Sequence, residues 1–177
     1  PAGTRAETLR LALAAADGTA LVAYENRPRP KTEEPARYAP PPPPRQVKTV
    51  EELFLAGLRI EQFHSAEHEP EPYYREALRR DPGDARTNTA LGLRMLRRGR
   101  LPEAERHLRA AVARLTANHT RAADGEPQYA LGLVLAARGE RDAAREAFAA
   151  AARDDGWTGA ATLEQARLES LAGRRES

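Results

Sequence analysis

From Thr49 onward, apolar side chains return at the spacing of an amphipathic helix. Leu53, Ala56, Gly57 and Ile60 share one face, because residues three and four apart lie together on a helix surface. Thr49 precedes this stretch as an N-cap, and two glutamates fall in the first turn, where the helix dipole favours acid. Pro and Gly then divide the pattern into further helices over about 73–80, 85–98, 102–117, 127–138 and 142–153.

The first 26 residues follow a different pattern, in which Leu alternates with small or charged side chains. Asp17-Gly18 separates this run from a second apolar run, and that dipeptide favours a two-residue hairpin turn. The expected cross-strand pairs are Leu13 with Val22, Leu11 with Tyr24, Ala12 with Ala23, and Ala14 with Leu21. We predict a β-hairpin within residues 1–26, with a weak N-terminal helix as the alternative.

Residues 27–48 form a Pro-rich linker, which includes five consecutive prolines from Pro40 to Pro44. Such a run favours the stiff, extended polyproline II conformation. A spacer between two domains is the interpretation we favour. A docking peptide for an aromatic groove is the alternative, because Pro-rich segments beside Arg are used in that way.

One stretch occurs twice within residues 49–177. Ala90-Leu91-Gly92, Gly99, Leu108 and Ala111 return 40 residues later as Ala130-Leu131-Gly132, Gly139, Phe148 and Ala151. A fixed period in this range indicates a repeat architecture, in which each unit stacks on the next. Gly99 and Gly139 follow the first helix of each pair, where a left-handed residue ends a helix.

These residues resemble the tetratricopeptide repeat, which has a small residue midway along its first helix and Ala, an aromatic or Leu, then Ala along its second. The resemblance implies an all-α, right-handed helical array of about three and a half helix pairs over residues 49–174. The small positions are Gly57, Gly92, Gly132 and Ala166, with spacings of 35, 40 and 34 residues. The longer interval places a loop insertion between Thr116 and Asp124.

A wider resemblance rests on Glu51-Glu52-Leu53, Leu55-Ala56-Gly57, Pro72-Tyr73-Tyr74 and the run from Glu76 to Ala85. It is to large bacterial proteins in which a domain of unknown function, shaped like a galactose-mutarotase β-sandwich, precedes tetratricopeptide repeats. The resemblance implies that residues 1–26 end an upstream β-sandwich. It also implies that the chain is a fragment of a longer protein with a loose link to carbohydrate.

The composition argues against nucleic-acid binding, cysteine chemistry and membrane association. The 28 basic and 26 acidic residues are interspersed and leave a net charge of +2, which does not indicate a nucleic-acid partner. The absence of Cys excludes disulfides and thiolate metal sites. No apolar run has the length of a membrane span and no secretory signal is visible, so we expect no membrane association and a cytoplasmic location.

The first helices of a tetratricopeptide array line a concave groove. Aligning the units places apolar side chains in rows that could hold an apolar peptide or helix, with Arg97 as a polar anchor. The groove residues are Phe54, Thr89 and Tyr129, then Leu58, Leu93 and Leu133, and further along Gln62, Arg97 and Ala137. Cover of this face by the chain's own linker or hairpin is an equal alternative, since an apolar strip requires some cover.

Two further sequence patterns, a possible zinc motif and an Arg cluster, give little support for a metal site or a nucleic-acid site. His64-Ser65-Ala66-Glu67-His68 matches the inverted zinc-peptidase pattern, but it runs into a Pro-rich helix end. We interpret His64 and His68 as residues favoured at a helix C-terminus. The Arg cluster from Arg94 to Arg109 is interrupted by glutamates and fits a solvated helix face. We therefore expect no catalytic residue, no metal and no cofactor in this fragment.

Two functions remain as hypotheses. The first is a non-catalytic scaffold, whose groove binds a protein segment or the protein's own upstream β domain. The second is an accessory module of a carbohydrate-active or carbohydrate-binding bacterial protein, with the active domain upstream of Pro1.

Overall fold

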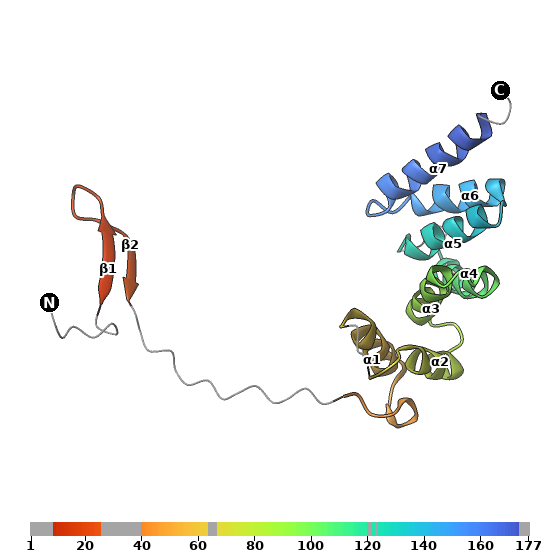
Figure 1. Ribbon diagram of the computed structural model, residues 1–177, viewed down its shortest axis with the longest axis horizontal. Coiled ribbons are helices and arrows are strands. Elements are labelled where there is room, and N and C mark those ends of the chain that lie inside the picture. Colours follow the sequence, from red (N-terminus) through yellow and green to blue (C-terminus); the bar gives the residue numbers. More distant parts are fainter. Residues whose placement is uncertain (1–8, 26–39, 64–66, 120–121, 123, 174–177) are drawn as a thin grey trace. The chain divides into compact units, whose positions relative to one another are not determined.

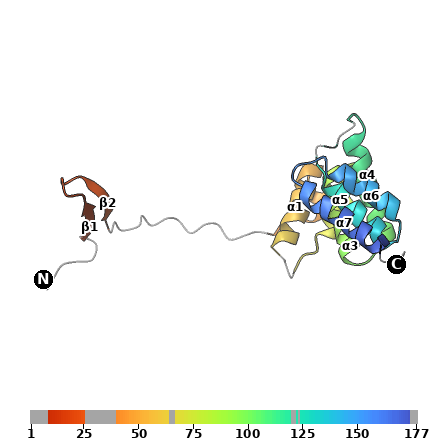
Figure 2. The same cartoon turned by 90° about the horizontal axis from the view of Figure 1, so that it is seen from above.

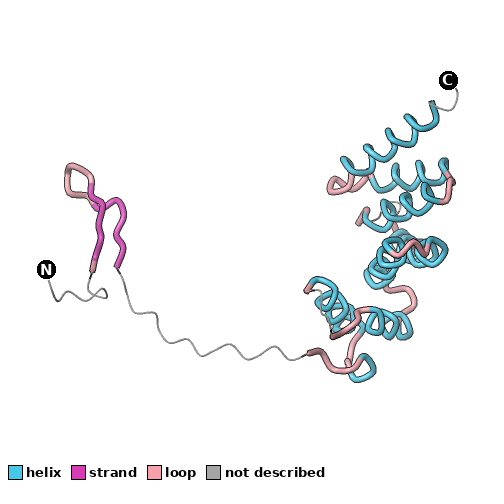
Figure 3. The backbone as a smooth tube through the Cα atoms, viewed as in Figure 1, coloured by secondary structure: helices cyan, strands magenta, loops and turns pink. Residues whose placement is uncertain are grey.

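The protein is described by a computed structural model, which defines residues 9–25, 40–63, 67–119, 122 and 124–173. The chain divides into two compact units, residues 1–40 and 41–177. The expectation of a mainly helical protein with an N-terminal antiparallel hairpin is confirmed. Figure 3 shows the strands of the first unit and the succession of helices in the second.

The first unit contains strands β1 (Arg10–Ala14) and β2 (Ala20–Glu25). The second begins with a short 3-10 helix, η2 (Pro44–Gln46). The helices that follow are α1 (Val50–Gln62), α2 (Glu71–Arg80), α3 (Ala85–Arg97), α4 (Leu101–Thr116), α5 (Glu126–Ala137), α6 (Arg141–Ala151) and α7 (Thr158–Gly173). The bounds expected from the Pro and Gly punctuation agree with these to within one or two residues.

The hairpin has the expected register at three pairs, Leu11 with Tyr24, Ala12 with Ala23, and Leu13 with Val22. The pairing of Ala14 with Leu21 was wrong, because a bulge shifts Ala14 onto Ala20. The turn is longer than two residues. Gly18 has a φ of 85° and donates its N–H to the Ala15 carbonyl, which is the geometry of a three-residue loop with a glycine bulge.

Apolar side chains of the hairpin are exposed on both of its faces. Leu11 is 69% exposed on one face, and Leu21, the extra residue of the bulge, is 59% exposed. A two-stranded sheet that buries so little apolar surface has only marginal stability in water. The hairpin therefore depends on packing that residues 9–25 do not supply to one another.

In the second unit, each helix packs against its neighbours along the chain: α1 on α2, α3 on α4, α5 on α6, and α7 on α6. Figure 1 shows α3 to α7 following one another as a stack of helices, and the perpendicular view in Figure 2 shows the helices superposed. One cluster of buried side chains runs from Tyr74 on α2 to Ala161 on α7. The core is thus continuous across the pairs.

Three helix pairs share one close contact. A Cβ built on Gly57 would lie 2.5 Å from Cε1 of Tyr74, one on Gly92 would lie 2.6 Å from Cγ of Leu108, and one on Gly132 would lie 2.5 Å from Cε1 of Phe148. Each large side chain is fully buried. Absence of a side chain on the first helix therefore makes room for a large one on the second. Ala166, the fourth small position, is exposed on α7, and no second helix covers it in the described part of the chain.

The helix termini follow local rules that the sequence makes visible. The Thr49 hydroxyl accepts from the Glu52 N–H, and the Glu52 carboxylate accepts from the Thr49 N–H, each at 3.1 Å, so the expected N-cap is a full capping box. Gly99 and Gly139 have φ of 71° and 83° and follow α3 and α5. The prediction of left-handed residues at these two helix ends is confirmed.

The same kind of turn, in which an Asp side chain accepts from the N–H two residues further on, follows α2 and α6. Asp81 accepts from the Gly83 N–H at 3.0 Å, and Asp154 accepts from the Gly156 N–H at 3.1 Å. The Asp154 carboxylate also accepts from the Gly125 N–H at 2.8 Å, which ties the start of α5 to the turn after α6. The connection between α4 and α5 is longer than the connections from α2 to α3 and from α6 to α7, in agreement with the predicted insertion after Thr116.

The end of the Pro-rich segment belongs to the helical unit. We expected the linker to extend to residue 48, but residues 41–48 pack on the first helix pair. Tyr73 donates its hydroxyl to the carbonyl oxygens of Pro41 and Pro42 at 3.3 and 3.1 Å. Arg80 donates to the carbonyls of Val47 and Lys48 at 2.8 and 2.9 Å. Val47 is buried among side chains of α1 and α2, so this segment anchors on the pair.

Candidate ligand-binding groove

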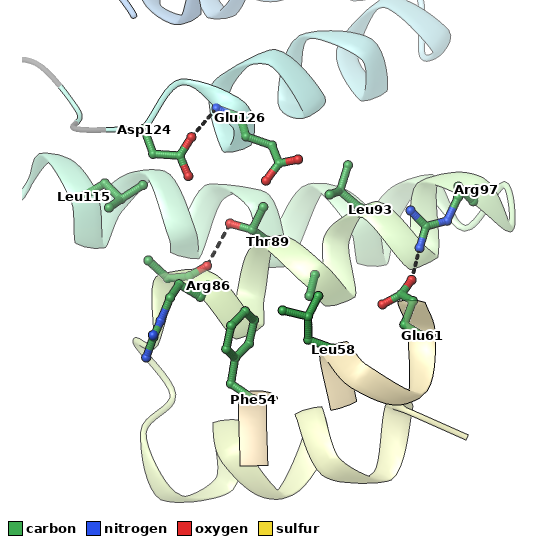
Figure 4. A pocket seen from close by; sticks show the side chains of 12 residues that line it. Phe54, Leu58, Glu61, Arg86, Thr89, Leu93, Arg97, Leu115, Asp124 and Glu126 are labelled. Atoms are coloured by element: carbon green, nitrogen blue, oxygen red, sulfur yellow. Dashed lines mark hydrogen bonds and ion pairs between the residues drawn. The ribbon is translucent and has the colours of Figure 1, made fainter. Parts of the chain in front are cut away.

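An open cavity of about 390 Å³ lies between α1, α3, the C-terminal end of α4 and the N-terminal end of α5. Its sides are mostly apolar, with charged side chains at the edges, as Figure 4 shows. The lining residues are Phe54, Leu58, Glu61, Ala85, Arg86, Thr89, Ala90, Leu93, Arg97, Leu115, Asp124 and Glu126. We call this cavity the groove.

The apolar floor comes from two helices. Phe54 and Leu58 lie one turn apart on α1, and Thr89 and Leu93 lie one turn apart on α3. Residues four apart occupy the same helix face, so each helix contributes one row. The Thr89 hydroxyl donates to the Ala85 carbonyl at 2.8 Å, which satisfies the polar group in the floor within its own helix.

The Phe54 ring is fixed by its neighbours. Its centroid lies 6.3 Å from that of Tyr74, at an interplanar angle of 34°. The Arg86 guanidinium carbon lies 4.9 Å from the Phe54 centroid, within the range of a cation–π contact. Arg86 also donates to Glu51 at 3.0 Å. This hydrogen bond lowers the pKa of the Glu51 carboxyl, and the Arg86 charge is therefore matched by Glu51.

A network around Glu61 closes the opposite end of the groove. Glu61 accepts hydrogen bonds from Tyr74 at 3.0 Å, from Arg94 at 3.3 Å and from Arg97. Burial, and then the Glu61 charge, raise the pKa of the Tyr74 hydroxyl, so it stays protonated and donates. Glu69 is a second carboxylate partner of Arg94, at 3.3 Å. The arginines of this end are thus balanced by carboxylates.

Asp124 and Glu126 form the edge contributed by the start of α5. The Asp124 carboxylate accepts from the Glu126 N–H at 2.9 Å. Figure 4 shows the Glu126 side chain directed toward the space beside Thr89 and Leu93. Burial, and then the nearby Asp124 charge, raise the pKa of the Glu126 carboxyl. Neither carboxylate has a cationic partner among the residues that the structure describes.

The structure brings together five of the predicted groove residues, Phe54, Leu58, Thr89, Leu93 and Arg97. Tyr129 and Leu133 lie elsewhere and do not line the groove. The Tyr129 ring packs 4.8 Å from Trp157 and 5.7 Å from Phe148. Trp157, which precedes α7, thus packs against the Tyr129 side chain of α5. Gln62 and Ala137, also aligned with these rows, are exposed at helix ends.

Sequence reasoning missed the residues that come from outside the aligned rows. Leu115, Asp124 and Glu126 flank the loop insertion after α4, and the aligned rows do not include them. An acidic pair immediately before Pro127 at a helix start was a usable signal. Residues 40–48 do not line the groove, so this part of the linker does not cover it.

Other candidates from the sequence are placed as follows. His64 lies outside the described residues, and His68 is half-buried after α1. The described residues contain no group of three or more potential metal ligands. Arginines of the basic cluster face carboxylates, as Arg98 does with Glu71 at 2.8 Å and Arg109 with Glu105 at 2.7 Å. This arrangement agrees with a solvated, charge-balanced helix surface.

No known protein-family model matches the chain. Among the helices of the described residues, none combines the length and apolar character needed to cross a membrane.

Proposed function

We propose that the helical unit is a tetratricopeptide-like, right-handed repeat scaffold without catalytic activity of its own, and that its groove binds a segment of a partner protein. The groove carries this proposal. It is open, its floor is apolar, and its side chains come from successive first helices of the pairs. A concave apolar site with a few charged groups at its edge is the common form of a binding site.

The shared construction of the pairs supports the scaffold. Gly57, Gly92 and Gly132 each accept a large side chain from the following helix, so the units stack by one rule. Stacked units of this kind create extended concave surfaces. The groove lies between two such units and the start of a third, where α1, α3 and α5 approach one another.

A random peptide library displayed against the full chain tests the proposal. We expect enriched peptides to lose about fivefold or more in affinity with Leu58→Ala, because a buried apolar contact at a binding site commonly contributes above about 1 kcal/mol. Leu163→Ala is the matched control, since Leu163 is an exposed leucine on α7, distant in sequence from the groove. Fluorescence anisotropy gives the affinities, and circular dichroism verifies that both variants stay helical.

Two results would overturn the proposal. One is a library that yields no enriched peptide. The other is a set of peptides that bind the Leu58→Ala variant as tightly as the wild type, which would place the binding surface elsewhere.

A further inference from the structure

The two edges of the groove differ in their charge balance. Its lining includes the carboxylates of Glu61, Asp124 and Glu126 and the guanidinium groups of Arg86 and Arg97. Arg97 pairs with Glu61, and Arg86 pairs with Glu51 just outside the lining. Both positive charges are therefore already matched, and the two carboxylates at the start of α5 have no cationic partner among the residues that the structure describes.

Asp124 and Glu126 accept few hydrogen bonds from the rest of the described chain. One oxygen of Asp124 accepts from the Glu126 N–H, as acidic groups at helix starts often do. The other Asp124 oxygen and the Glu126 carboxylate accept no hydrogen bond from any described residue. Both carboxylates thus keep acceptor positions for a group from outside the described chain.

Half-burial of Glu126, beside the exposed Asp124, makes ionisation of Glu126 unfavourable in the free protein. The pKa of Glu126 is raised, first by burial and then by the Asp124 charge, which means that the folded protein resists ionisation of Glu126. A positive charge placed between them would relieve the repulsion, because an opposite charge nearby favours the ionised form.

The apolar floor continues directly from this acidic edge. Figure 4 shows Glu126 above Thr89 and Leu93, with Phe54 and Leu58 on the facing helix. Lys and Arg side chains cover apolar surface with their methylene stems while the charged head reaches a polar group. A side chain of this type, beside an apolar neighbour, matches both parts of the groove.

We propose that the groove selects a partner-protein segment that carries Lys or Arg next to apolar residues, with the cation bound by Asp124 and Glu126. This inference rests on the proposed function and adds its specificity. An acidic segment would meet two carboxylates that no described residue neutralises, and it is rejected, since like charges that face each other cost binding energy. The carboxylates therefore act as the selecting group, and the apolar floor supplies contact area.

The test uses a random peptide library in which Lys and Arg together are as frequent as Asp and Glu together. We expect peptides enriched on the full chain to carry Lys or Arg beside an apolar residue. Glu126→Gln should weaken them by about five- to tenfold, because a partly buried, charge-assisted pair exceeds the value of an exposed one. Glu146→Gln, the matched control on an exposed glutamate of α6, should leave the affinity unchanged.

Each outcome decides a separate point. One result would be peptides that depend on Leu58 but lack Lys and Arg, or that bind Glu126→Gln as well as wild type. It would contradict the preference for Lys or Arg and would still support the groove as the binding site. A groove filled by a second copy of the chain would appear in sedimentation as a dimer that Leu58→Ala dissociates, and that result would overturn both. A stability measurement on Glu126→Gln separates loss of binding from loss of fold.

Discussion

Gly132→Ala tests the close contact that sets the spacing within a helix pair. The added Cβ would lie 2.5 Å from Cε1 and 2.6 Å from Cδ1 of Phe148, which is well inside van der Waals contact. The Phe148 side chain is fully buried, so its ring cannot turn toward solvent to make room. Either α5 and α6 must separate, or Phe148 must leave its preferred rotamer.

The expected loss follows from two opposing effects. Overpacking a filled core costs roughly 1–3 kcal/mol. Alanine is a better helix former than glycine by about 1 kcal/mol in a helix interior, which offsets part of the clash. We therefore expect Gly132→Ala to lower the free energy of unfolding by up to about 2 kcal/mol, or the melting temperature by up to about 8 °C in a unit of this size.

Gly159→Ala is the matched control, because a Cβ at Gly159 in α7 meets nothing within 4 Å. That variant has the propensity gain without the clash, so we expect its stability to be unchanged or raised by up to about 1 kcal/mol. Urea unfolding followed by circular dichroism measures both. If Gly132→Ala stabilised the protein as much as Gly159→Ala does, the contact between Gly132 and Phe148 could not determine the helix spacing.

Two further predictions concern the linker anchor and the acidic edge. Arg80→Ala should speed hydrogen exchange at the Gln46 and Val47 amides by about tenfold, since lost hydrogen bonds from a charged donor cost about 1.5 kcal/mol or more. Arg79→Ala is the control. It removes a guanidinium from Glu76 only and should leave these exchange rates unchanged. Glu126→Gln should raise stability at neutral pH. The folded-state pKa of Glu126 is raised above 4.5, so its contribution to stability is present below that pH and lost as the pH rises through the folded-state value. The gain measured by urea unfolding should therefore shrink below pH 4.5, and a gain independent of pH would contradict this cause.

The helices were predictable because local signals agree with one another. Thr49 and Glu52 form the capping box that their spacing indicates, and Gly99 and Gly139 take the left-handed conformation at the predicted helix ends. These features depend on residues within one or two turns of each other. The contact of Gly92 with Leu108 was also predictable, since its spacing returns in the next unit.

Features that depend on irregular segments could not be read in the same way. The hairpin bulge pairs Ala14 with Ala20. The sequence did not predict this pairing, because the Asp17-Gly18 dipeptide alone does not distinguish a two-residue turn from the three-residue loop around Gly18. Tyr129 aligned with the groove rows, yet Trp157, at the start of the next unit, covers it. Glu126 begins α5 directly after the irregular α4–α5 connection and lines the groove, although the aligned rows begin at Tyr129.

Methyl-group NMR of the full chain with a selected peptide locates the bound peptide on the protein. We expect the methyl signals of Leu58, Leu93 and Leu115, which line the groove, to shift as the peptide is added. The signal of Leu163, exposed on α7, should stay in place. Shifts confined to Leu163 and other residues outside the groove, with Leu58 and Leu93 unchanged at saturation, would show that the peptide does not bind in the groove.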